Sequence, residues 1–275
     1  MVDKGDYMAK KRADVLLFEK GLVDSREKAK TLIMEGIVFI GDRRVDKAGE
    51  KVEVDAPIRI KENPITYVSR GGLKLEKAIK AFNIKLQDKI CMDIGASTGG
   101  FTDCMLKEGA NKVYAIDVGY GQLDWKIRND PRVVIMERTN IRYITKEDIS
   151  DIVDFISIDV SFISLNLVLP VAKTLLSEEG SIVTLVKPQF EAGREKVGKK
   201  GIVRDKNTHI EVLKSIINIC NREGLKVVDL DFSPITGGTG NIEFLAYILK
   251  SNDIMGISEK KIHEVVNLAH ESLGD

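Results

Sequence analysis

The strongest constraint on the fold is a series of seven short apolar runs between residues 89 and 249, separated by segments with helical periodicity. The first five runs are continuously apolar, which is typical of parallel strands buried on both faces of a doubly wound α/β sheet. We expect the last two runs to pair as an antiparallel hairpin at the sheet edge, because only the glycine-containing segment SPITGGTGN separates them. The runs are KICMDIG, KVYAIDV, RVVIMERT, VDFISIDV, GSIVTLV, LKVVDLDF and IEFLAYIL.

The N-terminal part has a different pattern, with two short helical segments followed by short strand-like runs. Ser25 suits the N-cap of the second helix and Gly36 its C-terminal end, so this part predicts a small α+β unit. Pro64 and the pair Gly71-Gly72 then interrupt the pattern. We therefore expect a small domain over residues 1–63, a linker and first helix over 64–88, the α/β domain over 89–250 and a terminal helix over 251–275.

Composition excludes several classes of protein. No apolar run approaches the roughly 18 residues of a membrane span, and the N-terminus lacks the apolar stretch of a secretory signal, so we expect a cytoplasmic protein without a membrane partner. Three cysteines without C-x-x-C spacing predict neither a disulfide framework nor a metal site. The net charge of +0 does not favour nucleic-acid binding, yet residues 187–206 hold seven basic and three acidic side chains.

A glycine-rich segment follows the first strand and precedes a helix, the place where an open α/β sheet binds ligands. Its spacing is G-x-x-x-G-G instead of the G-x-G-x-x-G that cradles a pyrophosphate, so it favours a nucleoside without that group. Asp117 suits the ribose hydroxyls and Asn140 the adenine edge. A structural turn with helix-capping residues is the alternative. The candidate cofactor residues are Asp93, Gly95, Ala96, Ser97, Thr98, Gly99, Gly100, Phe101, Asp117, Asn140 and Asp159.

Four charged residues lie next to predicted strands or the first helix, namely Lys74, Asp159, Lys187 and Glu243. Asp159 and Lys187 follow the fourth and fifth strands and share the carboxyl edge of a doubly wound sheet. Burying a charge there costs stability unless it is paired or has a function. A set of ordinary buried ion pairs is the alternative to a catalytic cluster.

The residues resemble the TlyA-type ribosomal RNA 2′-O-methyltransferases, often called haemolysin A, whose catalytic domain is similar to that of FtsJ. The motifs are AKKRADVLLFEKGLVDSREKAKTLIMEG, YVSRGGLKL, MDIGASTGGFTD, DVSFISL, KPQFEAG and GGTGNIEFL. Ala13 departs from the leucine frequent in that N-terminal motif. The resemblance implies an S4-type RNA-binding domain, a Rossmann-like seven-stranded methyltransferase domain and S-adenosylmethionine as cofactor. It also implies a catalytic tetrad of Lys74, Asp159, Lys187 and Glu243.

The implied reaction is methylation of a cytidine ribose in small-subunit, and sometimes large-subunit, ribosomal RNA. Desolvation and a neighbouring cation can lower the pKa of a lysine from about 10.4 toward roughly 7 to 8, where it accepts a proton. We assign that role to Lys187, with Lys74 as the second cation, Asp159 orienting Lys187 and Glu243 ordering the lysines.

Basic residues of the N-terminal unit are candidates for contacts with RNA phosphates, and a solvated charged surface is the alternative. We expect the segment 191–206 to bind RNA near the active site. Three rival functions are a noncatalytic RNA-binding or ribosome-assembly protein, a small-molecule O-methyltransferase and a membrane-lytic toxin. The partner we expect is ribosomal RNA or a ribosomal subunit. The candidate RNA-binding residues are Arg12, Arg26, Lys28, Lys30, Arg43 and Arg44.

Overall fold

The computed structural model describes residues 10–23, 25–34, 36–60, 67–250 and 256–274. The chain divides into two compact units, residues 1–66 and residues 67–275. The predicted boundary near Pro64 lies outside the described residues, as do residues 251–255 and 275 of the predicted terminal segment. Among the residues that the structure describes, no helix combines the length and apolar character needed to span a bilayer.

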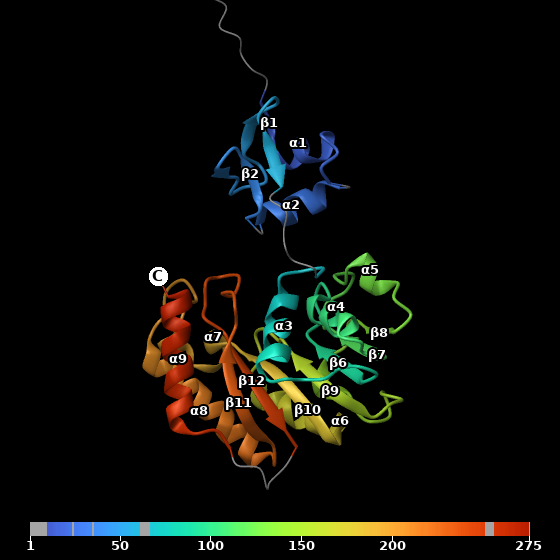
Figure 1. Cartoon of the computed structure of the whole chain (residues 1–275), viewed down its shortest axis with the longest axis vertical. Coiled ribbons are helices and arrows are strands. Elements are labelled where there is room, and N and C mark those ends of the chain that lie inside the picture. Colours follow the sequence, from blue (N-terminus) through green and yellow to red (C-terminus); the bar gives the residue numbers. More distant parts are fainter. Residues whose placement is uncertain (1–9, 24, 35, 61–66, 251–255, 275) are drawn as a thin grey trace, which may run out of the picture. The chain divides into compact units, whose positions relative to one another are not determined.

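The N-terminal unit packs two helices against short antiparallel strands (Figure 1). Ser25 Oγ accepts the Lys28 backbone N–H at 3.1 Å, and Gly36 has φ +73°, so both predicted ends of the second helix are confirmed. The strand Lys10–Arg12 was not predicted because its three side chains are all polar and exposed. The elements are β1 (Lys10–Arg12), α1 (Ala13–Glu19), α2 (Arg26–Met34), β2 (Val38–Ile40), β3 (Arg43–Arg44), β4 (Lys51–Glu53) and β5 (Ile58–Ile60).

The second unit is built on a seven-stranded sheet in the order β11-β12-β10-β9-β6-β7-β8. The first five strands run parallel, and β11 and β12 form the predicted antiparallel hairpin. However, β12 lies between β10 and β11, so of the two hairpin strands only β11 is an edge strand. The strands are β6 (Ile90–Ile94), β7 (Lys112–Ile116), β8 (Val133–Met136), β9 (Val153–Ile158), β10 (Leu176–Val186), β11 (Lys226–Phe232) and β12 (Phe244–Leu249).

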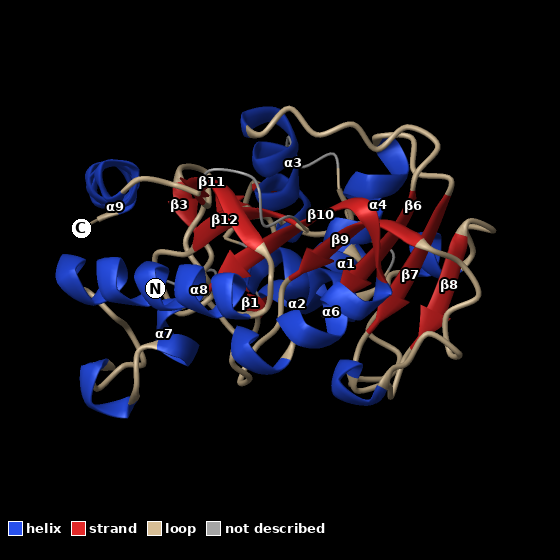
Figure 2. Ribbon diagram, turned by 90° about the horizontal axis from the view of Figure 1, so that it is seen from below, coloured by secondary structure: helices blue, strands red, loops and turns tan. Residues whose placement is uncertain are grey.

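Helices cover both faces of this sheet (Figure 2). On one face lie α3 and α4, and on the other lie α6 and α8, with α9 packed against α8 and β11. The α-helices are α3 (Gly71–Ala81), α4 (Gly100–Lys107), α5 (Trp125–Arg128), α6 (Leu169–Leu175), α7 (Pro188–Glu191), α8 (Lys206–Arg222) and α9 (Glu259–Leu273). Three 3₁₀ turns among the described residues are η1 (Ile141–Tyr143), η2 (Leu165–Leu167) and η3 (Arg194–Lys196).

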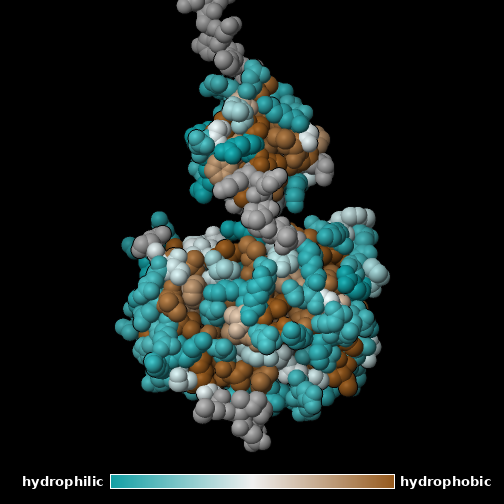
Figure 3. Space-filling view, viewed as in Figure 1, coloured by the Kyte–Doolittle hydropathy of each residue, from teal (hydrophilic) through white to brown (hydrophobic). Residues whose placement is uncertain are grey.

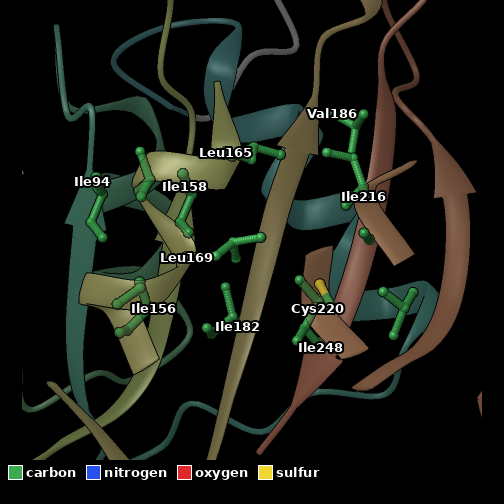
Figure 4. Close-up of a cluster of buried hydrophobic side chains, with 14 of the residues drawn as sticks. Ile94, Ile156, Ile158, Leu165, Leu169, Ile182, Val186, Ile216, Cys220 and Ile248 are labelled. Atoms are coloured by element: carbon green, nitrogen blue, oxygen red, sulfur yellow. The ribbon is translucent and has the colours of Figure 1, made fainter. Parts of the chain in front are cut away.

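The apolar strands account for the core between the sheet and these helices. Ile156, Ile182 and Ile248 from the sheet pack with Leu169 of α6 and Ile216 of α8, all at most 1% exposed (Figure 4). Because side chains of one strand alternate between faces, Cys91, Phe155 and Val183 belong to the second cluster under α3 and α4. Hydrophilic side chains cover most of the visible face of this unit (Figure 3). Two buried layers therefore fix the strand ends that carry the charged residues.

Candidate active site

A cavity of about 700 Å³ opens at the carboxyl edge of the parallel strands. Its walls come from the segments that follow β6, β7, β8 and β9, because parallel neighbours end at the same edge. Five of the predicted cofactor residues line it, namely Gly95, Ser97, Asp117, Asn140 and Asp159. The sheet thus brings together residues up to 64 positions apart in the chain.

Gly95 makes the turn that leads out of β6. Its φ is +89°, a conformation that favours glycine, and a Cβ placed there would lie 2.5 Å from the Asp159 carbonyl oxygen. The N–H groups of Gly95 and Ala96 both donate to the Ile116 carbonyl, at 2.9 and 3.0 Å. Backbone contacts with two neighbouring strands therefore hold the turn close to Asp159.

Asp117 lines the cavity, and its carboxylate binds two backbone N–H groups. Its Oδ2 accepts the Ser97 N–H at 2.8 Å, and its Oδ1 accepts the Gly119 N–H at 2.6 Å. Each carboxylate oxygen has a further acceptor site for a hydroxyl. Asn140 also lines the cavity, and its Oδ1 accepts the Arg142 N–H at 3.1 Å as the N-cap of η1.

Six predicted cofactor residues do not line this cavity. Asp93 is fully buried, where its carboxylate accepts from Thr102 Oγ1 at 2.7 Å and Ser157 Oγ at 3.2 Å. Burial raises the pKa of Asp93 to about 7. Its side chain thus joins β6 to α4 and β9, and it does not line the cavity. The others outside the lining are Ala96, Thr98, Gly99, Gly100 and Phe101, of which Phe101 packs in the core under α4.

The four charged candidates form two ion pairs. Lys187 Nζ lies 2.5 Å from Asp159 Oδ1, and Lys74 Nζ donates to Glu243 Oε2 at 2.6 Å. Lys74 and Lys187 are each 9% exposed and Glu243 is 3% exposed, so water is largely excluded from the Lys74–Glu243 pair. The Asp159 side chain is 20% exposed and lines the cavity, so the other pair borders the open space. In the antiparallel pair of β10 and β12, Val186 lies opposite Phe244. Lys187 directly follows Val186 and Glu243 directly precedes Phe244, so these two charged residues are neighbours at the same end of the two strands.

Ser161 and Phe162, which lie shortly after Asp159, contribute features that our sequence analysis did not single out. Ser161 Oγ accepts a hydrogen bond from Lys187 Nζ at 3.0 Å, which gives the amine a second fixed partner. Phe162 is 91% exposed with φ +63°, and its ring centroid lies 5.0 Å from that of Phe190. The signal was present in the motif DVSF, where a hydroxyl and an aromatic residue stand two and three positions after the charged one.

The candidate RNA-binding residues of the N-terminal unit are mostly paired with acids of the same unit. Buried Asp14 accepts from Arg12 Nε at 2.9 Å and from Arg26 Nη2 at 3.2 Å, and these bonds lower its pKa to about 2. Arg43 pairs with Glu50 at 2.6 Å. Sequence reasoning missed Asp14 as the centre of this cluster. The remaining pairs join Arg44 to Asp46 and Lys30 to Glu27, while Lys28 is exposed.

The donor set of the cavity fits an S-adenosyl nucleoside. The Asp117 carboxylate suits a ribose diol, the Gly95 turn lets a ligand approach the backbone, and Ile116, Val118 and Ile141 supply apolar wall for a base. Asp159 adds a negative charge in the same wall, which suits a sulfonium or an ammonium group. Among the described residues no cluster of three or more His, Cys, Asp or Glu side chains is placed to hold a metal ion.

Family models match both units. The FtsJ-like methyltransferase model matches residues 67–250, and the S4 domain model matches residues 11–58. The chain belongs to the TlyA (haemolysin A) family of FtsJ-like methyltransferases with an N-terminal S4 domain.

Relatives and solved structures agree with this assignment. The chain is 56% identical to "Putative rRNA methyltransferase YqxC" of Bacillus subtilis, over 96% of this chain and 95% of that protein. It is 40% identical to "16S/23S rRNA (cytidine-2'-O)-methyltransferase TlyA" of Mycobacterium tuberculosis, over 94% and 96% of the two chains. The solved "Putative hemolysin from Streptococcus thermophilus" is 50% identical with a TM-score of 0.78, covering 96% of this chain and 97% of that one.

Proposed function

We propose that this protein transfers a methyl group from S-adenosylmethionine to a ribose 2′-hydroxyl of ribosomal RNA, with cytidine as the target nucleoside. The observation that carries the proposal is the presence of two lysine–carboxylate pairs, Lys187–Asp159 and Lys74–Glu243, at the same end of the sheet. Asp159 of the first pair lines the cavity. A relative 40% identical is named for cytidine-2′-O methylation of 16S and 23S ribosomal RNA. An ordinary structural ion pair would not need to border a ligand-sized cavity.

S-adenosylmethionine, when bound, supplies an electrophilic methyl group. Lys187, in its neutral amine form, would take the proton of the ribose hydroxyl at Nζ as the hydroxyl oxygen bonds to that methyl carbon, and the bond to sulfur would break with its electrons on sulfur. Asp159 and Ser161 hold the amine from two sides, at 2.5 and 3.0 Å. These contacts orient the Lys187 amine before the substrate arrives.

Lys74 and Glu243 serve the same reaction from the neighbouring strand end. Lys74 supplies a second positive charge that holds the hydroxyl or the adjacent phosphate, and Glu243 fixes its position through the 2.6 Å bond. Exposed Phe162 offers an aromatic face at the cavity wall, on which a nucleobase can stack. The target nucleotide is then held by charge on its sugar-phosphate side and by the ring on its base side.

RNA binding is assigned to the basic residues of the S4 unit and to the segment 191–206. Exposed ion pairs contribute little to stability, so a phosphate can replace the internal acid as partner of Arg43 or Arg44 at small cost. Lys28 on α2 is exposed as well. The S4 unit therefore contributes affinity for the RNA backbone more than recognition of one base.

Replacing Arg43 and Arg44 together by glutamine is expected to weaken RNA binding and to lower the slope of log affinity against log salt by about 2, because about one counterion is released per phosphate contact. Titration of a ribosomal RNA fragment at several salt concentrations measures this slope. Lys85→Gln with Lys89→Gln is the charge-matched control, since both exposed lysines precede β6 at its amino end. An unchanged slope in the arginine variant would exclude these phosphate contacts.

The function is tested by incubating the protein with ribosomal subunits, naked ribosomal RNA and labelled S-adenosylmethionine, followed by mapping of 2′-O-methyl groups. We expect label on ribose of a small number of cytidines. Cofactor binding without label on any RNA would refute the proposal. Absence of cofactor binding as well would favour a noncatalytic RNA-binding role.

A further inference from the structure

Asn241 lies two residues before Glu243 and is fully buried in the loop between β11 and β12. Its Oδ1 accepts the Val203 N–H at 2.9 Å, and its Nδ2 donates to the Gly201 carbonyl at 2.8 Å and to Thr239 Oγ1 at 3.0 Å. A single amide thus joins two loops that are about 40 residues apart in the chain. Leaving such buried groups unpaired is costly, so the contact fixes both loops.

The same segment is held from its other side by His209 of α8. His209 Nε2 lies 3.1 Å from the Val203 carbonyl oxygen, and its Nδ1 lies 2.9 Å from Nε2 of His270 on α9. Burial lowers the pKa of His209 to about 4, so the ring is neutral near pH 7, with His270 and Asp205 as its charged or titratable neighbours. Because a carbonyl oxygen only accepts, Nε2 carries the hydrogen and donates a hydrogen bond to the Val203 carbonyl.

His209 also contacts β12, the strand that begins directly after Glu243. Its ring meets the Phe244 ring edge-on, with centroids 5.3 Å apart, and Phe244 directly follows Glu243. The backbone of Gly237 packs closely against the Glu243 carboxylate, because a Cβ added to Gly237 would lie 2.4 Å from Glu243 Oε1. The Gly237 N–H in turn donates to the Asn241 carbonyl at 2.9 Å.

The segment held by Asn241 and His209 carries positive charge. Lys199 and Lys200 are exposed in a tight turn, which is closed by bonds from Gly201 N–H to the Gly198 carbonyl at 2.8 Å and from Gly198 N–H to the Ile202 carbonyl at 3.1 Å. Exposed lysines on a rigid turn suit phosphates of an RNA backbone. We call residues 198–202 the basic turn.

We infer that Asn241 and His209 are positioning residues that hold the basic turn in fixed register with Glu243, so that RNA bound at the turn is aligned with the Lys74–Glu243 pair. The inference rests on the proposed function. Each residue acts through others, Asn241 through both loops and His209 through the Val203 carbonyl and Phe244. Neither side chain lines the main cavity.

The first test is Asn241→Ala. We expect kcat for RNA methylation to fall by about 10- to 100-fold, since small misplacements of reacting groups cost that much. The Kd for S-adenosylmethionine should stay within twofold of wild type. Asn221→Ala, an exposed asparagine on α8, is the matched control and should keep wild-type kcat. Wild-type kcat in Asn241→Ala, measured well below its melting temperature, would overturn the inference.

A pair of substitutions at His209 separates positioning from general packing. Glutamine places an N–H donor near the position of Nε2 and keeps the bond to Val203, whereas asparagine reaches only the position of Nδ1. We expect His209→Gln to stay within about threefold of wild-type kcat and His209→Asn to fall as Asn241→Ala does. Equal losses in both variants would show a packing role and overturn the inference.

A double-mutant cycle distinguishes failure of this inference from failure of the proposed function. Lys199→Gln with Lys200→Gln should weaken RNA binding, and adding Asn241→Ala should cost less than it does in the wild-type background, because the turn no longer holds RNA. Additive effects on kcat/KM would overturn the inference while leaving methylation intact. If wild-type protein methylates no RNA, the proposed function fails, and the same cycle on RNA affinity decides the inference.

Discussion

Replacing Lys187 by alanine is expected to lower the methyl-transfer rate by about 10²- to 10⁴-fold, the range that a positioned general base contributes. The substitution removes the amine that lies 2.5 Å from Asp159 and 3.0 Å from Ser161. Binding of S-adenosylmethionine should be largely retained, because Gly95 and Asp117 remain in the cavity wall. Single-turnover transfer to ribosomal RNA and calorimetry with the cofactor measure the two effects separately.

Lys187→Arg is the control for charge. A guanidinium keeps a positive partner for Asp159 but stays protonated, so it cannot accept the hydroxyl proton. We expect this variant to be nearly as slow as Lys187→Ala. A rate close to wild type in Lys187→Arg would show that the residue acts by its charge and would remove the assignment of Lys187 as the base.

Gly95→Ala is expected to abolish cofactor binding and to destabilise the α/β unit by about 2 to 4 kcal/mol. Two effects add. The new Cβ would lie 2.5 Å from the Asp159 carbonyl oxygen, and alanine would have to adopt φ +89°. Either the turn or the end of β9 must move, and both line the cavity. Chemical denaturation and cofactor titration give the two quantities.

Gly121→Ala separates backbone strain from the clash. Gly121 has φ +70°, but a Cβ at this position would meet no atom within 4 Å. We expect it to cost only about 1 to 2 kcal/mol, the strain of a left-handed conformation. If both variants lose the same stability and Gly95→Ala still binds the cofactor, the close approach of the turn to Asp159 is not what shapes the site.

The order of elements in the larger unit was predictable because its signal is local. Each apolar run is long enough to be recognised alone, and the parallel arrangement follows from the helices between runs. Residues at strand ends then come together without knowledge of side-chain contacts, which is why Asp159 and Lys187 could be placed at one edge. The S4 unit was recognisable from its motif more than from its short strands.

What escaped prediction depends on contacts between distant residues. Nothing near Asn241 in the sequence indicates that its amide binds Val203, and nothing near Asp14 indicates that it pairs with Arg26. The position of β12 between β10 and β11 likewise reflects long-range pairing, since a hairpin alone does not show which strand is at the edge. The buried hydrogen bond between Asp93 and Thr102 was also not visible in the sequence, because it depends on how α4 packs against β6.

The placement of β12 also dictates when the Lys74–Glu243 pair can form during synthesis. As the chain emerges from its N-terminus, β11 has no neighbour in the sheet until residues 244–249 insert beside β10. Glu243, the carboxylate partner of Lys74, lies 169 positions after it and directly before β12, so the two can pair only at this late stage. A nascent chain that lacks Glu243 and the last strand cannot form this buried ion pair, so the site that we propose for methyl transfer is complete only when the whole sheet has been made.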